Sequence, residues 1–431
     1  MVDLSAVRAF HPDPSRADPN QLVCPVYDTL NADDFARYTA RPHNAAGFVP
    51  RPAHRTLEQF LEGASRALEE AITSGAYARD ARPSLYVYGI QYTPPADIVE
   101  ALEPEDRRPS YLLLGLVGSL DIARLEHGQV ALHERTFPDR VAERVALTAS
   151  TGMGFAPILA GYHVAGHRLN DRLEELLGLH RRSLSFQGGV PPLVEATVSD
   201  AIHRLWRLDD PALVEELRGI VRELRLLILD GHHRFTAAAR RHYEGHPSAP
   251  LVMLVDGGDR ALQLLPWHRV LPPLVAPPEL VGERAEREFE EVVDHGRFAG
   301  PEAAIARLHR MRRDGRRGFL IHSAKRSLEV RLPDSTDAGA NFDGLHAFLE
   351  ESLSIDPESL SFVRSPRLAW EAIDPVAGAA SGGTAFLVPG LSARGVEARA
   401  FDRGEVMAQK TTMFLPKVAE GLLFAPVAPG A

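Results

Sequence analysis

Cysteine is almost absent from this sequence of 431 residues, which contains only Cys24. One cysteine can form neither an intrachain disulfide nor a cysteine-rich metal site. Long apolar runs are missing too, since the run from Tyr111 to Val117 is far shorter than the roughly 20 residues of a membrane-spanning helix. The N-terminus lacks a basic region followed by an apolar stretch, so no export signal is predicted. We therefore expect a cytoplasmic protein that does not contact a membrane.

Lysine is the second scarce residue. It fills only three of the 48 lysine and arginine positions, at Lys325, Lys410 and Lys417. A coding bias explains a general replacement of surface lysine by arginine. A lysine that remains can mark a position that requires a compact ammonium and not a planar guanidinium. Two of the three lie close together near the C-terminus, which is suggestive of a role for that segment.

Basic charge and the common nucleotide and hydrolase motifs are also lacking. The net charge is -10, and duplex DNA is bound largely through neutralisation of its phosphates, so DNA is not the expected ligand. A local basic pocket for a small phosphate compound remains compatible with this charge. The patterns GxxxxGK[ST], GxGxxG, GxSxG and HExxH do not occur, so Walker-type NTPases, Rossmann dehydrogenases, elbow hydrolases and zinc proteases lack their signatures.

The composition is that of a globular chain, with 45% hydrophobic and 25% charged residues. At roughly 150 residues per domain, its length favours two or three domains. A capping box at Thr56 and Gln59, followed by apolar residues at helical spacing, predicts a helix over 56–75. Apolar runs predict strands at 85–88 and 111–122.

Two proline pairs, Pro272-Pro273 and Pro277-Pro278, mark an expected boundary between residues 1–275 and 276–431. The irregular alternation of strands and helices indicates the α/β or α+β class. In the second part, the elements expected are helices at about 279–294, 302–313 and 344–353, and strands at 319–322, 328–332, 385–388 and 396–400.

The segment Leu226 to Tyr243 carries the strongest chemical signal. A predicted strand ends in the turn Asp230-Gly231-His232-His233, and a helix follows from Arg234. Such a turn leaves N–H groups open at the positive end of the helix dipole, where phosphate binds readily. In the alternative, Asp230 caps the helix and the cationic residues merely coat its first turn. Adjacent histidines diverge at a helix start, so a metal site is not predicted.

Two further clusters contain groups suited to phosphate chemistry. Glu134, beside His133 and Arg135, could act as a general base on a hydroxyl or contact Mg²⁺. Its alternative is a solvated, salt-bridged helix start. Lys410, followed by Thr411 and Thr412, is a candidate grip for phosphate or carboxylate, and its alternative is a lysine on an edge strand. A short polar pair, Tyr27-Asp28, interrupts an apolar stretch and is compatible with a simple turn.

Several motifs occur in the order seen in a large bacterial family, catalogued as domain of unknown function 1015, which the chain resembles from about residue 7 to its C-terminus. They are Val87-Tyr88, Gly115-Leu116-Val117, His133-Glu134, Leu205-Trp206-Arg207, Asp230-Gly-His-His-Arg234, His268-Arg269-Val270, Phe362-Val-Arg364 and Gln409-Lys410 through Pro416-Lys417. The family is similar to the ParB and sulfiredoxin superfamily, whose members bind nucleotide phosphates at a glycine-containing turn before a helix. Some relatives are kinases that phosphorylate free serine with ADP or ATP.

The resemblance implies a ParB/sulfiredoxin-like nucleotide-binding core with an additional C-terminal α/β region, whose last segment returns to the active site. The implied nucleotide-binding residues are Asp230, Gly231, His232, His233, Arg234, Gln409 and Thr411. Glu134 or Asp28 would then accept the proton of the hydroxyl, Lys410 would neutralise charge, and Mg²⁺ would accompany the ADP or ATP.

Two departures narrow the implied function. The phosphate turn has no cysteine, which sulfiredoxin chemistry requires, and the acidic chain lacks the basic DNA-reading helix–turn–helix of ParB proteins. The sequence therefore predicts a phosphotransferase that uses ADP or ATP on a small hydroxyl substrate such as free L-serine, with no DNA partner. The alternative is a non-catalytic nucleotide-binding regulator, and a homodimer is compatible with either.

Overall fold

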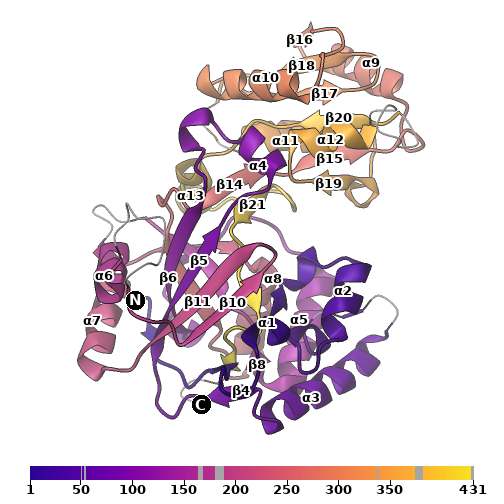
Figure 1. Ribbon diagram of the computed structural model, residues 1–431. Helices are drawn as coiled ribbons and strands as arrows, with labels where there is room; N and C mark the ends of the chain where they lie inside the picture. The colour runs from indigo at the N-terminus through magenta and orange to yellow at the C-terminus, as the bar shows by residue number, and fades with distance from the viewer. Residues whose placement is uncertain are drawn as a thin grey trace.

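The computed structural model describes residues 1–49, 51–52, 55–163, 168–179, 189–335, 337, 339–373 and 382–428. It has a mixed α/β architecture, which confirms the predicted class. Two sheets with helices packed around them contain most of the regular structure, and Figure 1 shows one sheet above the other. Within the described residues, no helix combines the length and the apolar character needed to cross a bilayer.

The larger sheet belongs to the first part of the chain and mixes both strand directions. Only the pairs β12–β7 and β13–β9 are parallel. The apolar run that begins at Tyr111 becomes a strand covered on both faces, as predicted. The strands, in spatial order, are β10 (Val194–Val198), β11 (Ala201–Leu208), β5 (Leu85–Tyr92), β6 (Tyr111–Leu120), β13 (Leu251–Asp256), β9 (Ile158–Tyr162), β12 (Leu226–Asp230) and β7 (Val130–Leu132), with β1 (Leu4–Ser5) beside β6.

Helices from the N-terminal half surround this sheet. The predicted capping box is present, because the Thr56 N–H donates to the Gln59 side chain at 3.2 Å and the Gln59 N–H donates to Thr56 Oγ1 at 3.3 Å. The helix that it opens is α3 (Leu57–Thr73), which confirms that prediction. The other helices are α1 (Pro19–Leu22), α2 (Ala32–Thr39), α4 (Ala96–Ala101), α5 (Pro138–Thr151), α6 (Arg168–Leu177), α7 (Pro211–Val221) and α8 (His232–Tyr243), with short 3₁₀ turns η1 (Tyr27–Thr29), η2 (Ala45–Gly47), η3 (Pro104–Asp106) and η4 (Ile122–Arg124).

The last segment of the chain returns to the first part. Two of its short strands, β22 (Ala419–Glu420) and β23 (Ala425–Pro426), pair with β3 (Cys24–Pro25) and β8 (Met153–Gly154). A third short pair joins β2 (Phe10–Pro12) to β4 (Tyr77–Arg79). The N-terminal segment is thus held down by strands and by contacts from the far end of the chain.

The smaller sheet is wholly antiparallel. Its strands, in spatial order, are β16 (Glu291–Asp294), β18 (Ser327–Arg331), β17 (Gly318–His322), β20 (Thr384–Leu387), β15 (His268–Leu271) and β19 (Ser361–Val363). The elements around it are α9 (Pro278–Glu288), α10 (Pro301–Arg313), α11 (Ala340–Ala347), η5 (a π-helical turn, Phe348–Ser352), η6 (Pro357–Ser359) and α12 (Pro366–Ile373). The strand β15 lies before residue 275 yet belongs to this sheet, and the division of the chain into 1–275 and 276–431 stays a prediction.

Two local predictions in this half are wrong. The helix expected over 279–294 ends at Glu288, and residues 291–294 form β16. The strand expected at 396–400 lies inside α13 (Ala393–Asp402), which buries Val396, Arg399 and Ala400. That spacing of three and four is helical, and a short segment rich in alanine fits either period.

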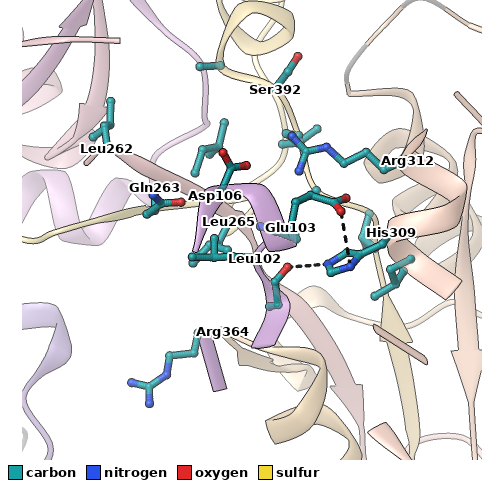
Figure 2. Close-up of a pocket in the computed structure, with 18 of the residues that line it drawn as sticks. Leu102, Glu103, Asp106, Leu262, Gln263, Leu265, His309, Arg312, Arg364 and Ser392 are labelled. Atoms are coloured by element: carbon teal, nitrogen blue, oxygen red, sulfur yellow. Dashed lines mark hydrogen bonds and ion pairs between the residues drawn. The ribbon is translucent and has the colours of Figure 1, made fainter. Parts of the chain in front are cut away.

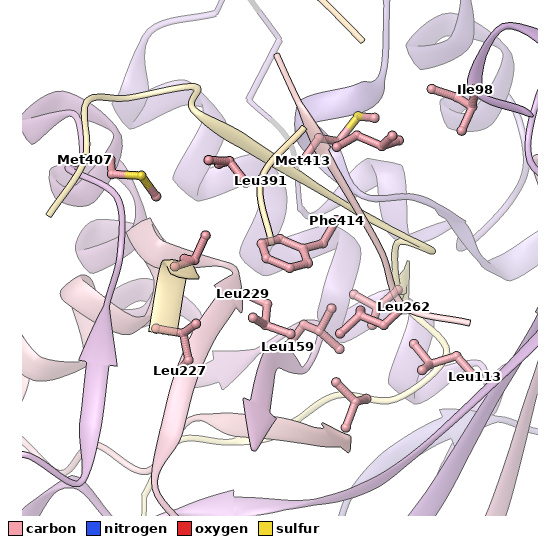
Figure 3. Packing of buried hydrophobic residues seen from close by; sticks show 14 of the residues in the cluster. Ile98, Leu113, Leu159, Leu227, Leu229, Leu262, Leu391, Met407, Met413 and Phe414 are labelled. Carbon is pink, nitrogen blue, oxygen red and sulfur yellow. The ribbon is translucent and has the colours of Figure 1, made fainter. Parts of the chain in front are cut away.

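A two-stranded ribbon lies between the two sheets (Figure 1). It pairs β14 (Gln263–Pro266) with β21 (Thr412–Leu415) in antiparallel register. Phe414 of β21 is fully buried, and in Figure 3 it lies among Leu229, Leu159 and Leu262. This packing holds β21 against the end of β12, where the most informative sequence motif begins.

Candidate functional site

The turn between β12 and α8 has the geometry of an anion site. Gly231 occupies the N-cap position with φ 91°, in the left-handed region that glycine adopts without strain. An added Cβ there would lie 2.8 Å from Arg234 Nη2, so a side chain at this position would also require the Arg234 guanidinium to shift. Among the described residues, no side chain forms a capping hydrogen bond at the start of α8. The positive end of the helix dipole is therefore open to an external acceptor.

Arg234 is directed differently from the sequence-based expectation. Its Nη1 donates to the carbonyl oxygens of Ala156 at 2.9 Å and Pro157 at 3.0 Å, and its Nη2 lies 3.2 Å from Asp230 Oδ2. The guanidinium therefore ties the turn to the segment before β9. A direct contact of Arg234 with phosphate stays a prediction.

Asp230 forms an ion pair with Lys417, which the sequence-based site residues did not include. The two side chains are 15% and 22% exposed, so the pair is largely withdrawn from water. Burial alone would raise the pKa of Asp230, but the charges of Lys417 and Arg234 outweigh it and hold that pKa well below its ordinary value. Asp230 is thus an anion under ordinary conditions, neutralised by two cations.

Glu134 brings the C-terminal segment to this turn. Its Oε1 accepts hydrogen bonds from the backbone N–H groups of Thr411 and Thr412, each at 2.7 Å. Burial raises the pKa of the Glu134 carboxyl above its ordinary value, and the hydrogen bonds from Thr412 and Thr411 oppose that rise. A half-buried carboxylate with a raised pKa is better matched than an ordinary glutamate to proton transfer near neutral pH.

Two buried histidines connect the same elements. His133 Nδ1 lies 2.8 Å from the Ile228 carbonyl oxygen, and its Nε2 lies 2.7 Å from Thr412 Oγ1. His232 Nε2 approaches His133 Nδ1 at 3.2 Å. Burial lowers the pKa of His133 to about 4 and that of His232 well below its ordinary value. Both rings are therefore neutral at pH 7, and His232 contributes no positive charge to an anion there.

Lys410 supplies an accessible cation. Its backbone is in the left-handed region, with φ 56°, and its Nζ lies 5.1 Å from the centroid of the Trp267 ring. No carboxylate in the described part of the chain forms an ion pair with it, although its charge lowers the pKa of Glu134. Its ammonium is therefore available to a negatively charged ligand.

These groups surround one cavity of about 360 Å³. A second space of about 760 Å³ adjoins it and shares Tyr27, Phe137, His233 and Lys410 as lining residues. Of the residues singled out in the sequence, the smaller cavity collects Glu134, Asp230, Gly231, His232, His233, Arg234, Gln409 and Lys410. The structure thus brings the α8 turn and the C-terminal lysine together.

One singled-out residue lies outside the cavity lining, and another has a side chain that the structure does not describe. Thr411 is fully buried and does not line the cavity, so its backbone N–H positions Glu134 instead. Asp28 lies in η1 between two lining residues, Tyr27 and Thr29, and its side chain is outside what the structure describes.

Sequence reasoning assigned no role to several lining residues, among them Lys417, Trp267 and Phe137. Lys417 carried a signal, the scarcity of lysine, but was not assigned a role. Trp267 and Phe137 carried none, because aromatic residues are common in ordinary cores. His233 stacks on Phe137 with ring centroids 5.9 Å apart, so an aromatic wall stands beside the polar turn.

A metal bound by protein groups alone is not indicated. Across the described residues, no group of three or more histidine, cysteine, aspartate or glutamate side chains could hold a metal ion. A cation that arrives with a phosphate ligand needs only one or two carboxylates from the protein. Glu134 fits that requirement, because its hydrogen bonds with Thr411 and Thr412 use Oε1 alone.

The sequence model of one family, described as a protein of unknown function (DUF1015), matches residues 4–342. No curated protein matches this chain by sequence. Among solved structures, a free serine kinase in complex with AMP is similar, with 14% identity and a TM-score of 0.39, covering 69% of this chain and 90% of that one.

Two further solved structures show a similar degree of likeness. A conserved hypothetical protein from Pyrococcus furiosus has 14% identity and a TM-score of 0.35, with 68% of this chain and 92% of that chain covered. A C-terminally truncated SbnI from Staphylococcus aureus has 13% identity and a TM-score of 0.36, with 69% and 82% covered.

Proposed function

This chain belongs to the DUF1015 family of proteins of unknown function, and we propose that it is a phosphotransferase acting at the cavity beside α8. In this proposal it binds ADP or ATP by the phosphates and transfers a phosphoryl group to a small hydroxyl compound, of which free L-serine is the leading candidate. One observation carries the proposal. The open N-terminus of α8, the accessible ammonium of Lys410 and the half-buried carboxylate of Glu134 face a single cavity.

Each part has a distinct task in phosphoryl transfer, which depends mainly on positioning and charge stabilisation. Phosphate oxygens accept from the first-turn N–H groups of α8, where the helix dipole favours negative charge. Lys410 offsets charge that develops on the transferring group. The neutral His232 and His133 rings place the turn and the Thr412 side chain without adding a charge of their own.

The sizes of the two cavities fit a nucleotide and an acceptor together. Small-molecule sites typically enclose about 300–1,000 Å³, and both spaces fall in that range. Three arginines, Arg51, Arg55 and Arg140, line the larger space. An acceptor that carries a carboxylate, as a free amino acid does, would find a cationic partner there.

The proton balance assigns a role to Glu134. The hydroxyl oxygen of the acceptor forms a bond to phosphorus while the bond from phosphorus to the leaving phosphate oxygen breaks. The hydroxyl proton passes to the Glu134 carboxylate, and the nucleotide leaves with one phosphate fewer. Mg²⁺, when bound with the nucleotide, would neutralise phosphate charge, and the carboxylates of the described cavity lining are Glu134 and Asp230.

Incubation with ATP or ADP, Mg²⁺ and a panel of free amino acids tests the proposal. Mass spectrometry should detect an acceptor that has gained one phosphate. Glu134→Gln should slow the transfer by about 10²- to 10⁴-fold, because the amide oxygen still accepts from Thr411 and Thr412 but cannot take a proton. Glu69→Gln, at an exposed position of α3, is the matched control and should leave the rate unchanged.

The outcome also separates the two candidate functions. Nucleotide binding with no phosphorylated product in the whole panel would favour the non-catalytic regulator. A product formed equally fast by Glu134→Gln would contradict the role given to that carboxylate.

A further inference from the structure

A third cavity, of about 260 Å³, lies along β14, whereas the first cavity is lined by β21. Figure 2 shows its lining, which comes from both halves of the molecule. The first half supplies the segment after α4 and the loop after β13, and the second supplies α10 and the loop before α13. None of its charged residues takes part in the phosphotransfer proposed above. Arg364 lines both cavities but has no role in that proposal.

Glu103 is the feature that calls for a ligand. It is only 7% exposed, and its Oε1 is buried with no hydrogen-bond partner in the described structure. Its Oε2 lies 3.6 Å from His309 Nδ1, beyond hydrogen-bond distance. A buried carboxylate oxygen left unpaired costs free energy, so the native state gains if a donor occupies the cavity.

His309 adds an acceptor next to that carboxylate. Its Nε2 lies 2.9 Å from the Ala101 carbonyl oxygen, which can only accept, so Nε2 carries the proton. In the neutral ring Nδ1 is then a lone pair facing Glu103. The dashed lines in Figure 2 mark these two contacts of His309. Two acceptors that face each other across this gap suit a group with several N–H donors, such as an ammonium.

Further charges of both signs border the same space. In the described part of the chain, the side chains of Asp106 and Arg312 line the cavity without forming an ion pair with each other or with Glu103. Arg312 comes from α10, and its Nη1 would lie 3.3 Å from a Cβ added at Gly390. In Figure 2 the Glu103 carboxylate is directed toward His309.

Apolar side chains line much of the remaining surface, beside the polar residues Asp259, Arg260, Gln263, His268, Arg364 and Ser392, and the volume is small. The apolar side chains are Leu102, Leu262, Leu264, Leu265, Ile305, Leu308, Val388 and Leu391. The cavity is slightly smaller than the roughly 300 Å³ at which small-molecule sites typically begin, so its size favours a small ligand over a nucleotide or a folded peptide. The ligand must therefore combine a small apolar body with charged groups.

We propose that this cavity binds a free α-amino acid with an apolar side chain. The ammonium lies between Glu103, Asp106 and His309 Nδ1, the carboxylate pairs with Arg312, and the side chain packs on the leucine-rich wall. This site goes beyond the proposed phosphotransfer and does not depend on it, because binding here involves neither Lys410 nor the α8 turn.

Calorimetric titration of the nucleotide-free, full-length protein tests the proposal. The probes are leucine, isoamylamine, which lacks the carboxylate, and isocaproate, which lacks the ammonium. Leucine should bind, and each truncated probe should bind at least about tenfold more weakly, since a charge-assisted contact is worth about 1.5–3 kcal/mol.

Two pairs of variants localise the binding. Glu103→Gln and Arg312→Gln should each weaken leucine binding by about tenfold or more. Glu105→Gln and Arg313→Gln change the same residue types at exposed positions outside the lining, and both should bind leucine as the wild type does. Circular dichroism shows whether each variant is folded. If Glu103→Gln does not fold, Arg312→Gln still tests the site, because Arg312 is exposed.

Three results would overturn the proposal. One is the absence of heat from any apolar amino acid at about 10 mM, far above a millimolar Kd. Another is isoamylamine binding as tightly as leucine, which would mean that the cavity binds a simple amine and does not recognise a carboxylate. The third is equal affinity in Glu103→Gln and Glu105→Gln. Phosphoryl transfer plays no part in these measurements, so their failure leaves the proposed function to its own test.

Discussion

Replacing Lys417 by methionine removes the partner of Asp230, the residue at which the turn before α8 begins. The side chains of Lys417 and Asp230 are 22% and 15% exposed, so the aspartate would be left largely out of water. Breaking a fully buried pair costs about 3–5 kcal/mol, whereas an exposed pair is worth about 0–1 kcal/mol. Because Arg234 stays 3.2 Å from Asp230, we expect a loss of about 2 kcal/mol in the free energy of unfolding.

Lys325 offers a matched control. It pairs with Glu279, but these side chains are 77% and 54% exposed. The same replacement, Lys325→Met, should therefore cost less than about 1 kcal/mol. Urea denaturation followed by circular dichroism measures both. If the unit that unfolds has roughly 250 residues, a loss of about 2 kcal/mol in the free energy of unfolding lowers the melting temperature by about 4–8 °C.

A double-mutant cycle isolates the pair itself. If Lys417 acts through Asp230, then Lys417→Met should cost much less in an Asp230→Asn background, because no buried charge is left unpaired. Equal losses from Lys417→Met and Lys325→Met would refute the reasoning, and so would a loss from Lys417→Met that is unchanged by Asp230→Asn.

Two predictions concern pH. Because the folded-state pKa of Asp230 is lowered, its ionised form stabilises the fold above about pH 4, the ordinary aspartate value, and this contribution is lost as the pH falls toward the folded-state pKa. The difference in melting temperature between wild type and Asp230→Asn should therefore shrink on acidification, and a constant difference would contradict the ion pair. Because the pKa of Glu134 is raised, its base form is lost at a higher pH than for an ordinary glutamate. The rate of phosphoryl transfer should fall with acidification from that higher pH, and a Glu134→Gln profile with the same inflection would exclude this carboxylate as its origin.

The local part of the site could be predicted from the sequence. A strand, a glycine turn and a helix within a short stretch fix the α8 N-terminus by backbone geometry, and the structure has these elements. What the side chains of that turn do was less predictable. The Arg234 guanidinium is held by the carbonyl groups of Ala156 and Pro157, whose position depends on how β9 pairs in the sheet.

Long-range partners carried almost no sequence signal. Lys417 reaches Asp230 across a separation of 187 residues, and the scarcity of lysine indicated only that its segment was unusual. The link from Glu134 to the N–H groups of Thr411 and Thr412 uses backbone atoms, which every residue has. The wrong strand at 396–400 has a different cause, because short segments rich in alanine fit helical and extended periods equally well.

Nucleotide titration by calorimetry, with Mg²⁺ present, tests the central claim that the α8 turn and Lys410 form a phosphate site. Wild type and Lys325→Met should bind ATP or ADP alike, and Lys410→Met should bind about tenfold or more weakly, because it loses a charge-assisted contact. Absence of nucleotide binding by the wild type, or an unchanged Kd in Lys410→Met, would contradict the claim.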